Sequence, residues 1–300
     1  MERKEAKEVE EVKDVKDKSA SVAAFFDLDG TLMCLPSLEK RFFSMLRYRK
    51  SIGFWNYILW IAEAARLMPR GINQIMYGNK MYLRGVRLDV DGGTDIPVCP
   101  DVAGTAEKKG LGGEKRRRQA RMPVPLFPGA IERVAWHAER GHLIVIVSGT
   151  LEFLAERMAR GLEAELGLRG VACTIRVCAT RLEEKRERWT GRVVGETMFG
   201  EEKARAIRRI AEEEGSDLRR CFAYGDSASD KWMLEAAGKP AAVNPSNDLA
   251  RIARRNEWTI LRWGKEKTFT QRAQSAQRTL RKNEAEHELQ VVRAKAGIRA

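Results

Sequence analysis

The sequence contains few residues of the kinds that cross-link a chain or bind zinc. Its five cysteines are an odd number, are widely scattered and include no pair separated by two residues. A disulfide scaffold is therefore not expected, and a reducing compartment such as the cytoplasm is the predicted location. Only three histidines occur, none at metal-ligand spacing to a cysteine, which argues against a zinc site.

Long apolar runs are also lacking. Residues 1–19 alternate acidic and basic side chains and contain no apolar segment of the kind found in secretory signals. The longest apolar stretch, residues 52–68, is interrupted by Asn56, Glu63 and Arg66. This stretch is too short and too polar to predict a membrane span.

The length and composition of the chain are typical of one large or two ordinary globular domains. The chain has 300 residues, of which 43% are hydrophobic and 32% charged, so it can bury a sizeable core. Its formal net charge of +13 raises the question of a nucleic-acid or anionic-membrane partner. Most of that charge falls on residues 108–121 and 265–300, leaving +3 for the predicted folded body once the −1 of residues 1–19 is counted. We therefore expect the net charge to say little about a reaction.

The pattern of apolar residues divides the chain into a core, an insertion and two tails. Residues 1–19 and 265–300 lack an apolar periodicity and are predicted to be a charged N-terminal tail and a basic C-terminal tail. Residues 20–36 and 123–264 alternate apolar strands with amphipathic helices. This alternation predicts an α/β fold with a doubly wound, Rossmann-like parallel sheet. Residues 37–122 would be a small helical cap domain inserted after the first strand.

The predicted cap has two parts. Pro36-Ser37 is a helix start signal and residues 69–71 are a break, so residues 37–84 are expected to form two or three helices. Residues 88–122 hold six glycines and the basic run 115–118, and are predicted to be a long insertion without regular structure. The basic run could contact nucleic acid or lipid. A solvated loop is preferred, because no nucleic-acid-binding signature accompanies it.

An aromatic stripe in the predicted cap has two interpretations. The preferred one is packing in the core of the cap, and the alternative is contact with a membrane or lipid. The stripe consists of Phe54, Trp55, Tyr57 and Trp60. Peripheral membrane contact is thus an open but less favoured expectation, and a nucleic-acid partner is not expected.

Three polar clusters each follow a predicted apolar strand. They are Asp27-Leu-Asp29-Gly-Thr31, Ser148-Gly149-Thr150 and Gly225-Asp226-Ser-Ala-Ser-Asp230. The carboxyl ends of parallel strands lie at one edge of a sheet, where ligands bind. We therefore expect these distant segments to converge on one site.

The residue types in these clusters indicate a metal and an anion. Asp27, Asp29 and Asp226 would repel one another unless a cation neutralised them. Carboxylate oxygens without His or Cys nearby favour Mg²⁺. Ser148, with the backbone N–H groups that follow it, would form an anion cradle near a helix start, and Lys203 could add a positive charge.

These four motifs, in this order, resemble the haloacid-dehalogenase superfamily of hydrolases, and in particular its phosphoserine-phosphatase-like branch, subfamily IB. Asp27–Thr31 corresponds to the family's first motif, Ser148 to the second, Lys203 to the third and Gly225–Asp230 to the fourth. For Lys203, an ordinary solvated helix position is the alternative, in which case Lys185 or Arg205 could supply the positive charge. The resemblance extends roughly over residues 20–264.

The resemblance implies a phosphatase. Asp27 would be the nucleophile that forms an aspartyl-phosphate, and Asp29 would be the general acid and base. Ser148, Gly149 and Lys203 would hold the phosphoryl oxygens. The expected substrate is a small phosphate ester, either phosphoserine-like or a lipid phosphate.

The resemblance also implies a bound Mg²⁺ as cofactor. Asp27, the backbone carbonyl of Asp29, and Asp226 would be its ligands. Asp230 would orient the metal shell through water or Lys203. A plain N-cap of the following helix is the alternative role for Asp230.

Two positions depart from the branch's pattern. The ninth residue after the nucleophile is Pro36, where phosphoserine phosphatases have a Glu that binds the substrate's amino group, and Gly30 stands where Ser is common. An amino-acid substrate is therefore in question. Two further hypotheses stay open: a catalytically silent fold that binds anionic partners through its basic segments, and phosphoryl transfer to an acceptor other than water.

Overall fold

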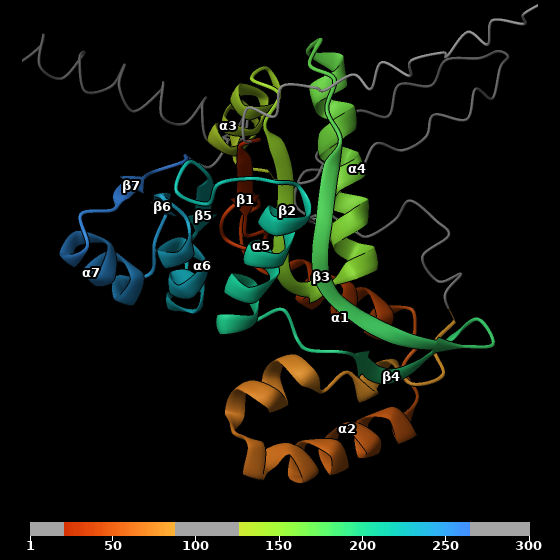
Figure 1. The fold of residues 1–300 in the computed structure, drawn as a ribbon. Coiled ribbons are helices and arrows are strands. Elements are labelled where there is room, and N and C mark those ends of the chain that lie inside the picture. The colour runs from red at the N-terminus through yellow and green to blue at the C-terminus, as the bar shows by residue number, and fades with distance from the viewer. Residues whose placement is uncertain (1–20, 88–125, 265–300) are drawn as a thin grey trace, which may run out of the picture.

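The computed structural model describes residues 21–87 and 126–264. The expected tails fall outside these residues, as does the insertion predicted for residues 88–122. The described chain is built around one sheet with helices on both faces (Figure 1).

The sheet has seven strands in the order β4-β3-β2-β1-β5-β6-β7. All neighbours pair in parallel except β3 and β4, which form an antiparallel hairpin at one edge. The strands are β1 (Ala23–Phe26), β2 (Leu143–Leu151), β3 (Ile175–Lys185), β4 (Arg188–Val194), β5 (Phe222–Gly225), β6 (Lys239–Val243) and β7 (Thr259–Leu261). The predicted doubly wound α/β fold is confirmed.

Alternate side chains of the central strands point to opposite faces of the sheet, where they belong to two separate hydrophobic cores. Phe26 of β1 and Ile146 of β2 face the helices α3 (Pro128–Ala138) and α4 (Glu152–Leu168). Phe25 and Val145 face the opposite layer, α5 (Glu201–Glu213), α6 (Lys231–Ala236) and α7 (Asn247–Arg255). Strands buried on both faces are continuous apolar runs, which is why β1 and β2 could be read from the sequence.

The register of the central strands brings the polar clusters to one level. Phe26 of β1 pairs with Ile146 of β2 and with Tyr224 of β5. The residues that follow on each strand therefore emerge side by side at the carboxyl edge of the sheet. The strand β2 is longer than expected, because it continues through the Ser148 cluster to Leu151, with a register shift on the way.

Residues 38–87 lie beyond this edge of the sheet, toward the bottom of Figure 1. They contain α1 (Leu38–Tyr48), α2 (Phe54–Leu67) and three short helical turns, η1 (Met68–Arg70), η2 (Gln74–Gly78) and η3 (Met81–Leu83). The remaining short turn, η6 (Ala228–Asp230), belongs to the core and precedes α6. We call residues 38–87 the cap segment.

The start and the end of the cap segment are tied to the core by specific contacts. Ser37 caps α1, its Oγ accepting from the Lys40 N–H at 3.4 Å, as the Pro36-Ser37 signal predicts. At the other end, the Gly85 N–H donates to the Trp189 carbonyl of β4 at 2.7 Å, and the Trp189 N–H donates to the Val86 carbonyl at 2.9 Å. In the described ranges, no helix combines the length and the apolar character needed to cross a bilayer.

Candidate active site

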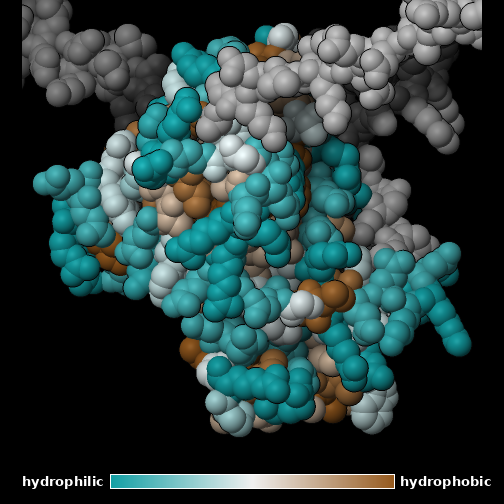
Figure 2. All heavy atoms as spheres, in the orientation of Figure 1, coloured by the Kyte–Doolittle hydropathy of each residue, from teal (hydrophilic) through white to brown (hydrophobic). Residues whose placement is uncertain are grey.

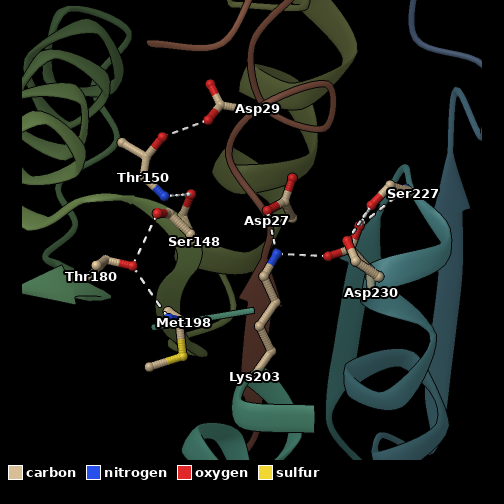
Figure 3. Close-up of polar contacts among 11 residues, drawn as sticks. Asp27, Asp29, Ser148, Thr150, Thr180, Met198, Lys203, Ser227 and Asp230 are labelled. Atoms are coloured by element: carbon tan, nitrogen blue, oxygen red, sulfur yellow. Dashed lines mark hydrogen bonds and ion pairs between the residues drawn. The ribbon is translucent and has the colours of Figure 1, made fainter. Parts of the chain in front are cut away.

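Asp27 lies at the centre of the site, at the end of β1, and is paired with a buried lysine. The Nζ of Lys203 is 2.5 Å from Asp27 Oδ1 and 2.6 Å from Asp230 Oδ1. All three side chains are buried. Lys203 reaches them from the first turn of α5, on the neighbouring layer (Figure 3). The structure thus joins residues from the expected first, third and fourth motifs by ion pairs inside the protein.

Asp29 is held by different groups and its side chain points away from Lys203 (Figure 3). Its Oδ1 accepts from the Leu38 N–H at 2.7 Å, and its Oδ2 accepts from the Thr150 hydroxyl at 2.6 Å. The Leu38 N–H belongs to the first turn of α1, where backbone donors lack helical partners and stabilise negative charge. The carboxylate of Asp29 therefore links the first helix of the cap segment to β2.

The Ser148 cluster is fixed by a short network. Ser148 is buried, and its Oγ accepts from the Thr150 N–H at 3.2 Å, so that N–H is already engaged. The anion cradle expected here is thus reduced to the Ser148 hydroxyl and the Gly149 N–H. Thr180 of β3 donates from its hydroxyl to the Gly149 carbonyl at 3.0 Å and accepts from the Met198 N–H at 3.2 Å.

Asp226 follows β5 and packs against the backbone of the Asp27 turn. A Cβ added at Gly30, whose φ is +91°, would lie 2.2 Å from Asp226 Oδ2. Only glycine fits here, because the close approach leaves no room and the positive φ disfavours other residues. This contact explains why the turn carries Gly30.

Asp230 binds Lys203 and stabilises a turn, but it does not make the cap of the following helix that was considered as its alternative role. It accepts from the Ser227 N–H at 3.0 Å and from the Ser227 hydroxyl at 2.9 Å, which closes a capping box at η6. Its other oxygen receives Lys203. It makes no side-chain cap of α6 itself. Asp230 therefore positions Lys203 while it stabilises the turn that carries Asp226.

The three carboxylates of Asp27, Asp226 and Asp230 fit a divalent cation. Each offers an oxygen, and these atoms lie within 4.8 Å of one another. One lysine ammonium cannot balance three clustered carboxylates, two of them buried and one half-buried, whereas a hard cation with oxygen ligands can. The Asp29 side chain is not part of this group, since it is bound to Leu38 and Thr150. This arrangement leaves its backbone carbonyl as the predicted ligand.

The pKa values of these groups reflect burial and mutual repulsion. Burial raises the pKa of Asp27 to about 7, although Lys203 opposes the shift. Burial, together with the neighbouring Asp27 and Asp230, raises the pKa of Asp226 to about 8. Burial by itself would lower the pKa of Lys203, but Asp230 and Asp27 outweigh it and the net direction is upward. Lys203 is therefore a permanent cation.

Burial also raises the pKa of Asp29, against the opposing hydrogen bonds from Thr150 and Leu38. A raised pKa favours the protonated carboxyl group that a general acid needs near neutral pH. Asp27 and Asp29 thus lie two residues apart in different environments, and only Asp27 is bonded directly to a cation.

These groups open into a cavity of about 520 Å³ that is lined from both the core and the cap segment. Phe43, Trp60 and Tyr82 lie on the cap side, and Phe43 packs edge to face on Tyr82 at 5.1 Å between ring centroids. Tyr77 of η2 stacks on Phe199 of the core at 3.8 Å between ring centroids. A phosphate at Asp27 would therefore carry its alcohol group into a largely aromatic space.

Sequence reasoning missed several of these residues. Thr180, Tyr77 and Phe199 belong to no motif, and their partners lie far away along the chain. The hydroxyl of Thr150 was also missed, although the residue lies in a cluster that drew attention. Part of the expectation for the aromatic stripe is wrong: Tyr57 packs against the core, but Phe54 and Trp55 are each 72% exposed.

The similarity of this chain to known proteins agrees with the arrangement of the site residues described above. The sequence pattern of the haloacid dehalogenase-like hydrolase family matches residues 24–235. A Mycobacterium tuberculosis protein with the name "Probable phosphatase" is 33% identical over 247 residues, which are 81% of this chain and 75% of that protein. The chain therefore belongs to the haloacid dehalogenase-like hydrolase family.

Two other similarities are more limited. A phosphoserine phosphatase of M. tuberculosis is 35% identical over 135 residues, and the match spans 45% of this chain but only 41% of that protein. The crystal structure of a Bordetella pertussis protein of unknown function matches with a TM-score of 0.56 at 23% identity, over 81% of this chain and 99% of that chain. This second likeness concerns the fold.

Proposed function

We propose that the protein is a Mg²⁺-dependent phosphomonoesterase that works through an aspartyl-phosphate on Asp27, with a small phosphate ester as substrate. The observation that carries the proposal is the convergence of Asp27, Asp29, Ser148 and Lys203 on one cavity. A fold alone has no need of two neighbouring buried carboxylates held by different partners. The names of the M. tuberculosis relatives, a phosphoserine phosphatase and a phosphatase, support the same class of reaction.

In the first half of the reaction, a carboxylate oxygen of Asp27 attacks phosphorus. The bond from phosphorus to the alcohol oxygen breaks, and that oxygen takes its electron pair and a proton from Asp29. The Ser148 hydroxyl and the Lys203 ammonium bind the phosphoryl oxygens, whose charge Lys203 offsets.

In the second half, Asp29, now ionised, takes a proton from water, whose oxygen attacks the phosphorus of the aspartyl-phosphate. The acyl phosphate bond breaks, inorganic phosphate leaves, and Asp27 is regenerated. Bound at Asp27, Asp226 and the Asp29 carbonyl, Mg²⁺ would neutralise charge on the phosphoryl group. A cytoplasmic location is part of this proposal, and the described cysteines are free.

The test is Mg²⁺-dependent hydrolysis of an aryl phosphate by the full chain and by Asp27→Asn. We expect activity with Mg²⁺, its loss in EDTA, and a loss of at least about 10³-fold in the variant, because no nucleophilic attack remains. Asp248→Asn, an exposed aspartate on α7, is the matched control and should retain activity.

Two outcomes would contradict the proposal. Wild-type turnover by Asp27→Asn would exclude the aspartyl-phosphate. A lack of activity with any divalent metal would favour a silent fold that binds anionic partners. Product analysis in the presence of an added alcohol distinguishes hydrolysis from transfer to another acceptor.

A further inference from the structure

The cavity beside Asp27 contains one carboxylate outside the catalytic cluster, and it is already neutralised. Lys80 Nζ lies 2.6 and 2.7 Å from the two carboxylate oxygens of Glu39, and the Tyr82 hydroxyl donates to Glu39 at 2.7 Å. Lys80 is only 1% exposed. Glu39 is therefore bound within the protein and does not offer a free negative charge to a substrate.

The rest of the described lining favours apolar groups. Apart from the catalytic residues, the cap side presents the rings of Phe43, Trp60 and Tyr82, with Leu35 and Met76 exposed on the same wall. Lys40 also lines the cavity and would repel a cation. A substrate ammonium placed here would lose water without gaining a free carboxylate among the described lining residues. An alkyl or aryl group would instead exchange water for rings and hydrocarbon.

We propose that the site selects phosphate monoesters of uncharged, apolar alcohols and rejects esters that carry an ammonium group, phosphoserine included. This inference rests on the proposed phosphatase activity. Because Glu39 is paired with Lys80, it does not attract a substrate ammonium. The aromatic side chains on the cap side of the cavity bind the apolar alcohol group instead.

The wild-type full chain tests the proposal with Mg²⁺ and four alkyl phosphates: octyl phosphate, methyl phosphate, phosphoethanolamine and phosphoserine. We expect kcat/KM for octyl phosphate to exceed that for phosphoethanolamine by about 100-fold or more. A preference for phosphoserine or phosphoethanolamine would overturn this proposal and leave the phosphatase activity intact. Hydrolysis of none of the esters would overturn the phosphatase activity and this proposal with it.

Variants of Lys80 and Trp60 test which residues determine the preference between substrates. Lys80→Met frees the Glu39 carboxylate, so the preference for octyl phosphate over phosphoethanolamine should fall about tenfold, and Lys80→Arg should keep it. Trp60→Ala, at a partly exposed position, should lower the ratio of octyl to methyl phosphate turnover. Unchanged ratios in folded Lys80→Met and Trp60→Ala would overturn the assignment.

The outer face of α2 carries a second, independent inference. Its solvent-exposed side carries the apolar residues Phe54, Trp55, Ile58, Ile61, Ala62 and Ala65, with the charged Arg66 at its edge. The two charged residues of the helix, Glu63 and Arg66, are paired with each other. A helix that is apolar on its exposed side normally faces a partner. Figure 2 shows hydrophobic surface at this lower end of the molecule, over the region where Figure 1 places α2.

The charge around this face indicates what the partner is. The cap segment, residues 38–87, contains ten Lys and Arg but only two Asp and Glu. Both acidic residues, Glu39 and Glu63, are engaged in ion pairs. An apolar stripe with exposed Trp and Phe, beside an excess of cations, is complementary to an anionic bilayer surface.

We infer that α2 docks on anionic membranes, lying in the plane of the interface. Its 14 residues extend about 21 Å, which is shorter than the hydrocarbon core, so the helix can lie on a bilayer but cannot cross it. Trp55, Ile58 and Ile61 would enter the acyl boundary, and the exposed Arg66 and Arg70 at the end of the helix would contact lipid phosphates.

Co-sedimentation of the full chain with vesicles tests this inference. We expect binding to vesicles that contain phosphatidylserine, weaker binding to pure phosphatidylcholine, and a loss of at least about tenfold for the double variant Trp55→Glu, Ile58→Glu. Leu168→Glu, on an apolar residue of α4 that is 59% exposed, is the matched control and should bind as wild type.

Two results would contradict the inference that α2 docks on membranes. Equal vesicle binding by the double variant and by wild type would overturn the inference, since the basic segments alone would then explain the binding. A dimer of the wild-type chain in sedimentation equilibrium that the double variant abolishes, without vesicle binding, would assign the face to a second copy instead.

Discussion

Asp27 and Asp29 are two residues apart, yet the groups that hold them come from different parts of the chain. Asp27 is bound to Lys203 on α5, whereas Asp29 is bound to the start of α1 and to Thr150 on β2. Two carboxyl groups in distinct environments can take distinct roles, one ionised and one protonated. In the proposed reaction, Asp27, paired with Lys203, offers a carboxylate oxygen as the nucleophile, while Asp29, whose pKa burial raises, gives the proton to the leaving alcohol.

Gly30 permits the approach of Asp226 to this pair, and its replacement tests the carboxylate cluster. In Gly30→Ala the new Cβ would overlap the Asp226 carboxylate, and the positive φ would add strain of about 1–2 kcal/mol. We expect a loss of at least about tenfold in apparent Mg²⁺ affinity, measured by Mg²⁺ titration of the activity. Gly71→Ala is the matched control, because Gly71 has a φ of +93° but no atom within 4 Å of the added Cβ. Equal Mg²⁺ affinities for the two variants would show that the overlap with Asp226 has no effect.

At the scale of single residues, the sequence predicts which side chains form the site but not which contacts hold them in place. Asp27, Asp29, Ser148, Lys203 and Asp226 could be predicted as one site, because each follows an apolar strand or starts a helix. The supporting contacts could not be predicted. The Thr180 hydroxyl, for example, bonds to the carbonyl of Gly149 on another strand, and a threonine in a strand is usual without any such role.

At the scale of elements, η2 and the turn before α5 join the cap segment to the core. Tyr77 of η2 stacks on Phe199 at 3.8 Å between centroids, and the same ring lies 3.7 Å from a Cβ placed at Gly149. The two residues are far apart in sequence, and only the fold brings them together. The stack of Tyr77 on Phe199 therefore covers Gly149, and no local sequence pattern predicts it.

Removing that stack should loosen the cap segment without unfolding the core. For Tyr77→Ala we expect kcat/KM to fall about tenfold and cleavage within the cap segment to become faster in limited proteolysis, because a stacked pair contributes about 0.5–1.5 kcal/mol beyond its buried area. Tyr77→Phe keeps the ring and should behave as wild type. Tyr48→Ala, an aromatic residue of α1 that is 86% exposed, controls for loss of a ring alone. If Tyr77→Phe is as impaired as Tyr77→Ala, the hydroxyl and not the stack is responsible.

Elements with strong apolar runs were predictable, and weakly apolar ones were not. The strands β1, β2 and β5 and the helices α3 to α5 correspond to predicted segments. The helix α7 was missed because its buried face is only Leu249, Ala250 and Ala253, among charged neighbours. The prediction that α2 packs in the core of the cap was partly wrong for the opposite reason, because this helix is rich in apolar residues. Its apolar residues suggested a core, and only the placement of the helix at the outer edge shows that more than half of them face solvent.

At the scale of the whole molecule, the charge is distributed less evenly than the sequence total suggests. The predicted folded body carries +3, but the cap segment within it holds eight more basic than acidic residues. The remaining −5 falls on residues 88–107, so the core of residues 20–37 and 122–264 is neutral overall. The total charge follows directly from the composition, but which charged residues share a surface depends on the fold. A positive cap beside an acidic catalytic cluster attracts phosphate esters and anionic surfaces to the same side of the molecule.

The pH dependence of folding provides a test of the core as a whole through His137. This histidine is fully buried, its Nε2 lies 2.9 Å from the Tyr224 hydroxyl, and its Nδ1 lies 2.8 Å from His142 Nδ1. Burial lowers the pKa of His137 to about 3, from the ordinary 6.5. Between these two values the unfolded chain binds a proton that the folded chain does not. The contribution to stability is therefore complete above about pH 6.5 and is lost as the pH falls toward 3.

We expect the free energy of unfolding of the wild-type chain to fall, relative to His137→Gln, by about 1.4 kcal/mol per pH unit between pH 6 and 4. Urea unfolding of both proteins in EDTA at pH 7, 6, 5 and 4 measures the difference. Asp27 and Asp226 have raised pKa values and contribute with the opposite sign, but they are common to both proteins and cancel. His142→Gln is the matched control: His142 is less buried, so removing it should change the slope less than removing His137. Parallel pH profiles for wild type and His137→Gln would mean that His137 is protonated as readily in the folded core as in water.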